Sequence, residues 1–135
     1  MSPAQTVGSS AVYYSEKDTA PDLPAVLSDG AGEPIDLTGS SVTISIAYSR
    51  YSYYYSPTRR IVDRSPCVVD PDQINNTGLV RWTPGDGDLS PPGQYLYYFQ
   101  VTYPGGGVQT IPPNTYLPMI IRTPVGGQEG NIGGP

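Results

Sequence analysis

The sequence has no histidine, one cysteine and one lysine among its 135 residues. Without histidine, an imidazole base cannot activate a serine or cysteine nucleophile. The single cysteine, Cys67, excludes an internal disulfide, and its neighbours Val68 and Val69 favour a buried, inert thiol. The glutamates are scattered through loops and ends, which gives little weight to a glycosidase pair. We therefore expect no enzyme activity and no cofactor.

Positive charge and long apolar runs are also scarce. Seven basic residues stand against twelve acidic ones, for a net charge of −5. Basic runs that would neutralise phosphates are missing, which argues against nucleic-acid binding. No apolar run approaches the length of a membrane-spanning helix. Residues 1–5 lack the pattern of a secretory signal, so we expect synthesis in a cytosol and no membrane contact.

Glycine, proline and tyrosine are abundant instead. There are sixteen Gly, sixteen Pro and twelve Tyr, which predicts many turns, few helices and large aromatic burial. The length suits one domain. We expect a domain over residues 11–124, between a flexible N-terminal arm at 1–10 and a flexible Gly-rich C-terminal tail at 125–135.

The clearest local pattern is a β-hairpin over residues 93–112. Tyr95, Tyr97, Phe99 and Val101 fall on one face of an extended chain, because successive side chains alternate between faces. Aromatic and β-branched residues fit such a half-buried surface. Three glycines at 105–107 turn the chain, and residues 108–111 return antiparallel. This hairpin needs further strands to cover its apolar face.

Shorter patterns predict those strands. Residues 42–48 alternate most strictly, with an apolar and a polar face. Pro24 and Pro118 indicate edge positions or bulges. Trp82 is a candidate core residue between two sheets, and Tyr95 resembles a corner tyrosine. The pattern predicts an all-β fold, an immunoglobulin-like antiparallel β-sandwich of about seven to eight strands. Besides the hairpin, we expect strands at 11–16, 23–28, 42–48, 61–62, 67–69, 79–83 and 116–122.

A tyrosine-rich segment at 49–60 is the sharpest candidate site. It combines tyrosines with arginines and almost no aliphatic residues, a composition enriched at protein interfaces. Stacking on sugar rings and completion of the domain's own core are the two alternatives. The candidate binding residues are Tyr51, Tyr53, Tyr54, Tyr55, Arg50, Arg59 and Arg60.

Asp86 and Asp88 are weak candidates for oxygen ligands of Ca²⁺, together with Asp70 and Asp72. The spacing of a calcium-binding loop is missing, and six or more oxygen ligands are needed. A polar turn that bonds its own backbone explains the same residues more simply. We therefore predict no metal site.

The ordered motifs also resemble a known family. The first motif runs from Asp18-Thr19 through the turn Asp29-Gly30 to Pro34-Ile35-Asp36-Leu37-Thr38-Gly39 and the strand at 42–48. The others are Gly78-Leu79-Val80-Arg81-Trp82, Pro92-Gly93-Gln94-Tyr95 and Gly105-Gly106-Gly107-Val108-Gln109-Thr110-Ile111-Pro112. In this order they resemble the phage baseplate upper protein N-terminal domain family, over about residues 11–122.

This resemblance implies a β-sandwich module of a tailed-phage virion. The expected function is that of a non-enzymatic structural subunit of the baseplate or tail, the neck, or the capsid surface. Its partners would be other virion proteins and further copies of itself, after synthesis in the host bacterial cytoplasm. Residues 11–16 or the Gly-rich tail could add a strand or arm to a neighbour. The alternative is a carbohydrate-binding module for attachment to the host surface.

Overall fold

The computed structural model describes residues 11–49, 59–112 and 117–124, and none of these residues is helical. The expected flexible ends at 1–10 and 125–135 lie outside the described residues. The all-β prediction is confirmed. The eight strands are β1 (Val12–Ser15), β2 (Leu23–Val26), β3 (Ser41–Tyr48), β4 (Arg60–Val69), β5 (Leu79–Trp82), β6 (Gly93–Thr102), β7 (Val108–Ile111) and β8 (Leu117–Arg122).

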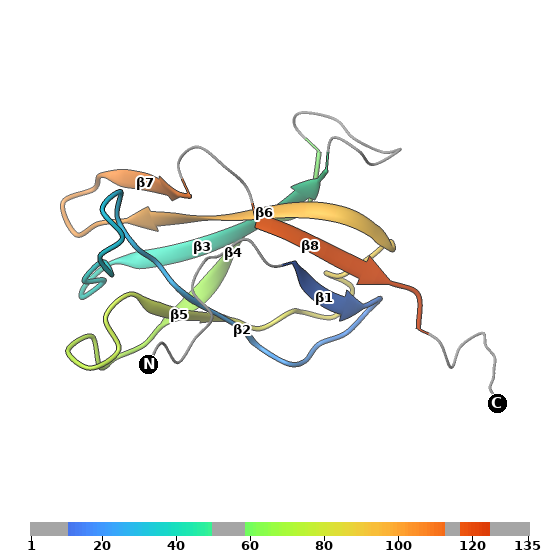
Figure 1. The fold of residues 1–135 in the computed structure, drawn as a ribbon, viewed down its shortest axis with the longest axis horizontal. Coiled ribbons are helices and arrows are strands. Elements are labelled where there is room, and N and C mark those ends of the chain that lie inside the picture. Colours follow the sequence, from blue (N-terminus) through green and yellow to red (C-terminus); the bar gives the residue numbers. More distant parts are fainter. Residues whose placement is uncertain (1–10, 50–58, 113–116, 125–135) are drawn as a thin grey trace.

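The strands pair along one path that curls into two layers. Their order is β1-β8-β6-β3-β4-β5-β2, and β7 also pairs with β6. Strand β4 belongs to both layers, because its first part pairs with β3 while Val68 and Val69 pair with β5. Figure 1 shows β3, β6 and β7 above β2 and β5. The immunoglobulin-like β-sandwich is thus confirmed.

One strand pair departs from the antiparallel prediction. β1 runs parallel to β8, with Val12 opposite Met119, whereas the other pairs between strands are antiparallel. The two strands come from opposite ends of the domain, so no hairpin turn fixes their direction. The prediction of a purely antiparallel sandwich was therefore wrong at this edge.

The prediction of two short strand pieces at 61–62 and 67–69 was also wrong. They form one ten-residue strand, β4, which passes through Pro66. Pairing with β5 begins only at Val68, so Pro66 has a strand neighbour on one side alone. A proline is tolerated at such an edge, because no second ladder needs its missing N–H.

The other prolines follow the same rule. Pro24 lies in β2, which ends the strand order, so its predicted edge position is confirmed. Strand β8 lies between β1 and β6, so Pro118 is not in an edge strand. Pro118 pairs with Leu96 of β6, whereas the pairing with β1 starts one residue later, at Met119. At this position β8 has one strand neighbour.

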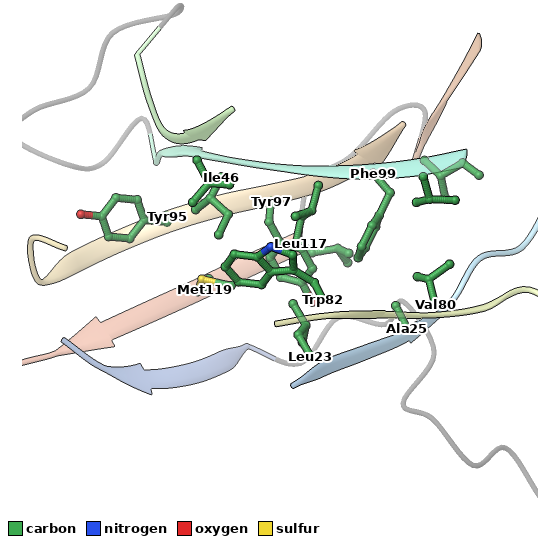
Figure 2. Close-up of a cluster of buried hydrophobic side chains, with 14 of the residues drawn as sticks. Leu23, Ala25, Ile46, Val80, Trp82, Tyr95, Tyr97, Phe99, Leu117 and Met119 are labelled. Atoms are coloured by element: carbon green, nitrogen blue, oxygen red, sulfur yellow. The ribbon is translucent and has the colours of Figure 1, made fainter. Parts of the chain in front are cut away.

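Trp82 fills the space between the layers, as predicted. Its side chain is 1% exposed, and Figure 2 shows it among Leu23 of β2 and Leu117 and Met119 of β8. The indole Nε1–H donates a hydrogen bond to the Ser65 hydroxyl at 2.9 Å. The ring therefore buries its apolar surface without leaving its one polar group unsatisfied.

The predicted hairpin is confirmed as β6 and β7. Thr102 pairs with Val108 across the glycine turn, and the inward face of β6 is buried from Tyr95 to Val101. The Tyr95 hydroxyl donates a hydrogen bond to the carbonyl of Pro91, four residues earlier. A hydrogen bond from a tyrosine hydroxyl to a backbone carbonyl a few residues earlier defines a tyrosine corner in immunoglobulin-like domains. Here it joins the start of β6 to the residues just before it.

Candidate functional site

The structure describes two of the seven predicted binding residues, Arg59 and Arg60, at the start of β4. The other five, Arg50, Tyr51, Tyr53, Tyr54 and Tyr55, lie outside the described residues. Both arginines contact a tyrosine from another strand of the sheet. The site can therefore be followed from Arg59 and Arg60 into the sheet.

Arg59 lies over the ring of Tyr48 at the end of β3. Its guanidinium carbon is 5.1 Å from the ring centroid, and that ring is 5.0 Å from the ring of Tyr95. A guanidinium at this distance is attracted by the negative face of the ring. Tyr48 and Tyr95 are both buried, whereas Arg59 is exposed. Arg59 therefore lies on the surface, directly over the edge of the core.

Arg60 lies beside Tyr98 on the outward face of β6. Its Nε–H donates a hydrogen bond to the Tyr98 hydroxyl at 2.9 Å. Its guanidinium carbon is 6.0 Å from the centroid of the same ring. These contacts join β4 to β6 across β3, because β3 lies between the two strands in the sheet.

A polar hollow of about 190 Å³ opens next to this pair. Its walls come from β4 and β6, and its lining side chains are almost all polar. They carry two positive charges and one negative charge, in a chain whose net charge is −5. The lining residues are Arg60, Asp63, Arg64, Tyr98 and Gln100.

The hollow depends on an irregular pairing of β3 with β4. Three residue steps on β3, from Ile44 to Ala47, face five steps on β4, from Arg60 to Ser65. β4 thus carries two more residues than its partner over this stretch. Extra residues in one strand form bulges, which bend the strand and redirect side chains. As a result, Asp63 and Arg64 are both exposed although they are consecutive.

Arg64 has a backbone conformation that is rare for residues other than glycine. Its φ is +54°, a region that costs roughly 1–2 kcal/mol when a Cβ is present. The backbone N–H of Arg64 donates a hydrogen bond to the Ser45 hydroxyl at 3.1 Å. Ser45 is 1% exposed and lies opposite Tyr98 in the sheet. The bulge is thereby fixed to the middle of β3.

Arg64 and Asp63 form only a loose ion pair. Arg64 Nε lies 3.3 Å from Asp63 Oδ1, with side-chain exposures of 68% and 58%. An ion pair this exposed contributes at most about 1 kcal/mol, because water and salt screen it. Arg64 is therefore held firmly through its backbone and weakly through its side chain.

The candidate Ca²⁺ ligands bond the backbone of their own turns. Asp88 Oδ2 accepts the N–H of Gly85 at 2.8 Å, and Asp70 Oδ1 accepts the N–H of Asp72 at 2.8 Å. Asp86 is exposed. Residues 11–49, 59–112 and 117–124 contain no group of three or more His, Cys, Asp or Glu side chains that could hold a metal ion. The polar-turn interpretation accounts for these contacts.

Cys67 lies on β4 and is partly buried. Burial raises the pKa of its thiol to about 12, so the reactive thiolate is rare at neutral pH. This agrees with the predicted inert thiol, although the residue lies at the margin of the core rather than inside it.

Four residues that line the hollow were not among the sequence candidates: Asp63, Arg64, Tyr98 and Gln100. Strict alternation along β6 places Tyr98 and Gln100 on the face opposite Tyr97 and Phe99, so a signal for these two was present. Arg64 had no such signal, because its direction follows from the bulge.

Comparisons with known proteins give a distant structural likeness. No family model matches the chain, and no curated protein matches it. Among solved structures it is similar to the crystal structure of CopC from Methylosinus trichosporium OB3b. That match has 13% identical residues and a TM-score of 0.46, and it covers 85% of this chain and 86% of that chain. A likeness this distant says nothing of function. In the part of the chain that the structure describes, no helix is long and apolar enough to cross a membrane.

Proposed function

We propose that this chain is a non-enzymatic structural subunit of a tailed-bacteriophage virion. It acts through contacts with other virion proteins of the capsid, neck, tail or baseplate and with copies of itself. The observation that carries the proposal is the ordered set of motifs over about residues 11–122, which resembles the phage baseplate upper protein N-terminal domain family. The protein would be synthesised in the host bacterial cytoplasm and would then become part of the virion.

The motif residues build the turns of the sandwich, which supports the proposal. Asp29 Oδ1 accepts the N–H groups of Ala31 and Glu33 at 2.8 and 3.0 Å, and so closes the Asp-Gly turn. Gly78 has a φ of +82°, and a Cβ there would lie 2.7 Å from the Leu27 carbonyl oxygen. Such positions require glycine. The motifs therefore carry physical constraints of this fold.

Two surface features suit assembly. Arg59 and Arg60 are the last two residues of the tyrosine-rich segment at 49–60. Tyr and Arg are the residue types enriched in interface cores and hot spots. The strand order ends in β1 on one side and β2 on the other. Sheet edges of this kind can pair with a strand of a neighbouring chain.

The pKa of two turn carboxyls is shifted away from the range that acid catalysis needs. A carboxyl that acts as a general acid near neutral pH needs a raised pKa. The hydrogen bond from the Thr38 hydroxyl lowers the pKa of Asp36, and the hydrogen bond from the Asn75 amide lowers that of Asp72. Both carboxylates serve as acceptors within their own turns.

Carbohydrate binding is the second candidate, favoured by the row Tyr51, Tyr53 and Tyr55. On the described face it has less support. Sugar stacking needs an open aromatic face, and the Arg60 guanidinium lies over the ring of Tyr98. At this hollow the sugar alternative has no open tyrosine ring, so it depends on the tyrosine-rich segment.

The test is to purify tailed-phage particles from a host that expresses this chain, and to look for the chain in them. We expect mass spectrometry to detect it in fixed proportion to the major capsid protein, and cryo-electron microscopy to place the sandwich against a neighbouring subunit. Its absence from washed particles would refute the proposal. A solvent-facing tyrosine row at a distal tip, with binding on a glycan array, would favour carbohydrate attachment.

A further inference from the structure

We propose that the hollow between β4 and β6 binds the side-chain carboxylate of an Asp or Glu residue on a neighbouring protein, with Arg64 as the principal donor. This inference rests on the proposed assembly function, and it names the chemistry of the partner. It does not depend on the place of the chain in a particle, and it can be tested on the isolated protein.

The backbone of Arg64 supports this proposal. A bulge with a non-glycine residue at positive φ is unfavourable, and such outliers are typical of functional sites. Arg64 has a φ of +54°, and its N–H is fixed to the buried Ser45 hydroxyl. Fixing the backbone sets the direction in which the side chain leaves the strand. The strained conformation turns Arg64 towards the hollow, beside Arg60 and Gln100.

The hydrogen-bond donors of Arg64 suit a carboxylate. A guanidinium has five N–H donors in a planar fork that matches the two oxygens of a carboxylate. Among the residues that the structure describes, Arg64 forms its ion pair with Asp63, through Nε. Because this pair is exposed, an incoming carboxylate can share or replace Asp63 at little cost. Gln100 adds a side-chain amide to the same wall.

The hollow is small and polar. Its volume of about 190 Å³ is below the roughly 300–1,000 Å³ typical of cofactor and drug-like sites, so it suits a single side chain. A sugar would require an open aromatic face, and the Arg60 guanidinium lies over the Tyr98 ring that lines the hollow. The hollow carries a net charge of +1 on a protein of net charge −5. An acidic side chain is the occupant that fits all three properties.

The experiment is a nuclear magnetic resonance titration of the ¹⁵N-labelled full chain with the blocked peptide Ac-Gly-Glu-Gly-NH₂ at constant ionic strength. The matched probe is Ac-Gly-Gln-Gly-NH₂, which has the same shape without the charge. We expect saturating shifts at the backbone amide of Arg64 and the side-chain amide of Gln100. The glutamine peptide should bind about tenfold more weakly, since it loses the charge-assisted contact.

Variants separate a site from general charge attraction. Arg64→Gln should weaken binding about fivefold or more, whereas Arg81→Gln, which removes an exposed charge from β5, should change it less than about twofold. Asp63→Asn should strengthen binding, because it removes the competing carboxylate. Arg64→Gly provides a second test if Arg64→Gln folds poorly, since glycine accepts the positive φ but cannot bind the peptide.

Equal weakening by Arg64→Gln and Arg81→Gln, or equal shifts with the two peptides, would overturn the proposal. Stronger binding of inorganic phosphate than of the glutamate peptide at the same residues would also overturn it, in favour of a phosphate ligand. If the peptide binds but the chain is absent from particles, the carboxylate site stands and the virion function falls.

Discussion

Replacing Tyr95 by phenylalanine tests the corner at the start of β6. The substitution keeps the ring, which packs against Tyr48 with 5.0 Å between centroids, and removes the hydroxyl that bonds the Pro91 carbonyl. Loss of a hydrogen bond that leaves its acceptor unpaired costs roughly 1–2 kcal/mol. For a chain of 135 residues, about 1.5 kcal/mol corresponds to a fall in Tm of about 5 °C.

Tyr97→Phe is the matched control. Tyr97 lies two residues along the same face of β6 and is also buried, and its ring meets Phe99 edge-on at 5.9 Å. The Tyr95 hydroxyl donates a hydrogen bond, whereas the Tyr97 hydroxyl makes none to another described residue. We therefore expect Tyr97→Phe to change the free energy of unfolding by less than about 0.5 kcal/mol.

The assay is urea unfolding followed by the fluorescence of Trp82, the single tryptophan of the chain. Trp82 is buried between the layers, so its emission reports loss of the core. The slope of the free energy against urea should stay the same in both variants, because the exposed surface on unfolding does not change. Equal stability of wild type and Tyr95→Phe would refute the role assigned to the corner. Equal destabilisation by Tyr95→Phe and Tyr97→Phe would also refute that role.

Two further predictions concern the backbone and pH. Gly78→Ala should destabilise the fold by more than about 2 kcal/mol, because it adds a contact with the Leu27 carbonyl to the cost of positive φ. The matched change Gly87→Ala, at φ +81° with no atom within 4 Å of the new Cβ, should cost only about 1 kcal/mol; similar urea midpoints for the two variants would contradict this. Burial raises the pKa of Tyr14 and Tyr97 to about 12, whereas an unfolded tyrosine ionises near pH 10. Since the folded state binds these protons more tightly, their stabilising contribution is complete below about pH 10 and is lost as the pH rises towards 12. Urea midpoints that stay constant from about pH 9 to 11.5 would contradict this assignment.

Local patterns were sufficient to predict the strands whose core face is marked by alternating apolar residues. Residues 42–48 and 95–101 alternate with period two, and the structure places their apolar members in the core. The hairpin turn was also local, because three glycines follow the end of β6. In these elements, residue chemistry and tertiary packing favour the same conformation, which is the condition for sequence reasoning to succeed.

Features that depend on a distant partner were not predictable. The parallel pairing of β1 with β8 joins segments about a hundred residues apart, and nothing in either segment specifies its direction. The continuity of β4 through Pro66 depends on which of its sides is paired. In both cases the controlling contact is made by another strand, and the sequence of the segment does not contain it.

The residues of the candidate site also fall into two groups, those that local sequence predicted and those that it did not. Arg59 and Arg60 stood out by composition, because arginine and tyrosine are concentrated at 49–60. Arg64 did not, since simple alternation through β4 would give Asp63 and Arg64 opposite faces. Only the two extra residues of β4, seen in its pairing with β3, expose both.

Ser45 connects the irregular strand to the hollow. By its register opposite Tyr98 it belongs to the outward face of β3, where a serine would ordinarily meet water. It is nevertheless buried, and its hydroxyl accepts the Arg64 N–H. A buried serine on an outward face requires a cover, and the bulge supplies it. The strain at Arg64, the burial of Ser45 and the charged hollow are therefore features of one local structure, the irregular pairing of β4 with β3.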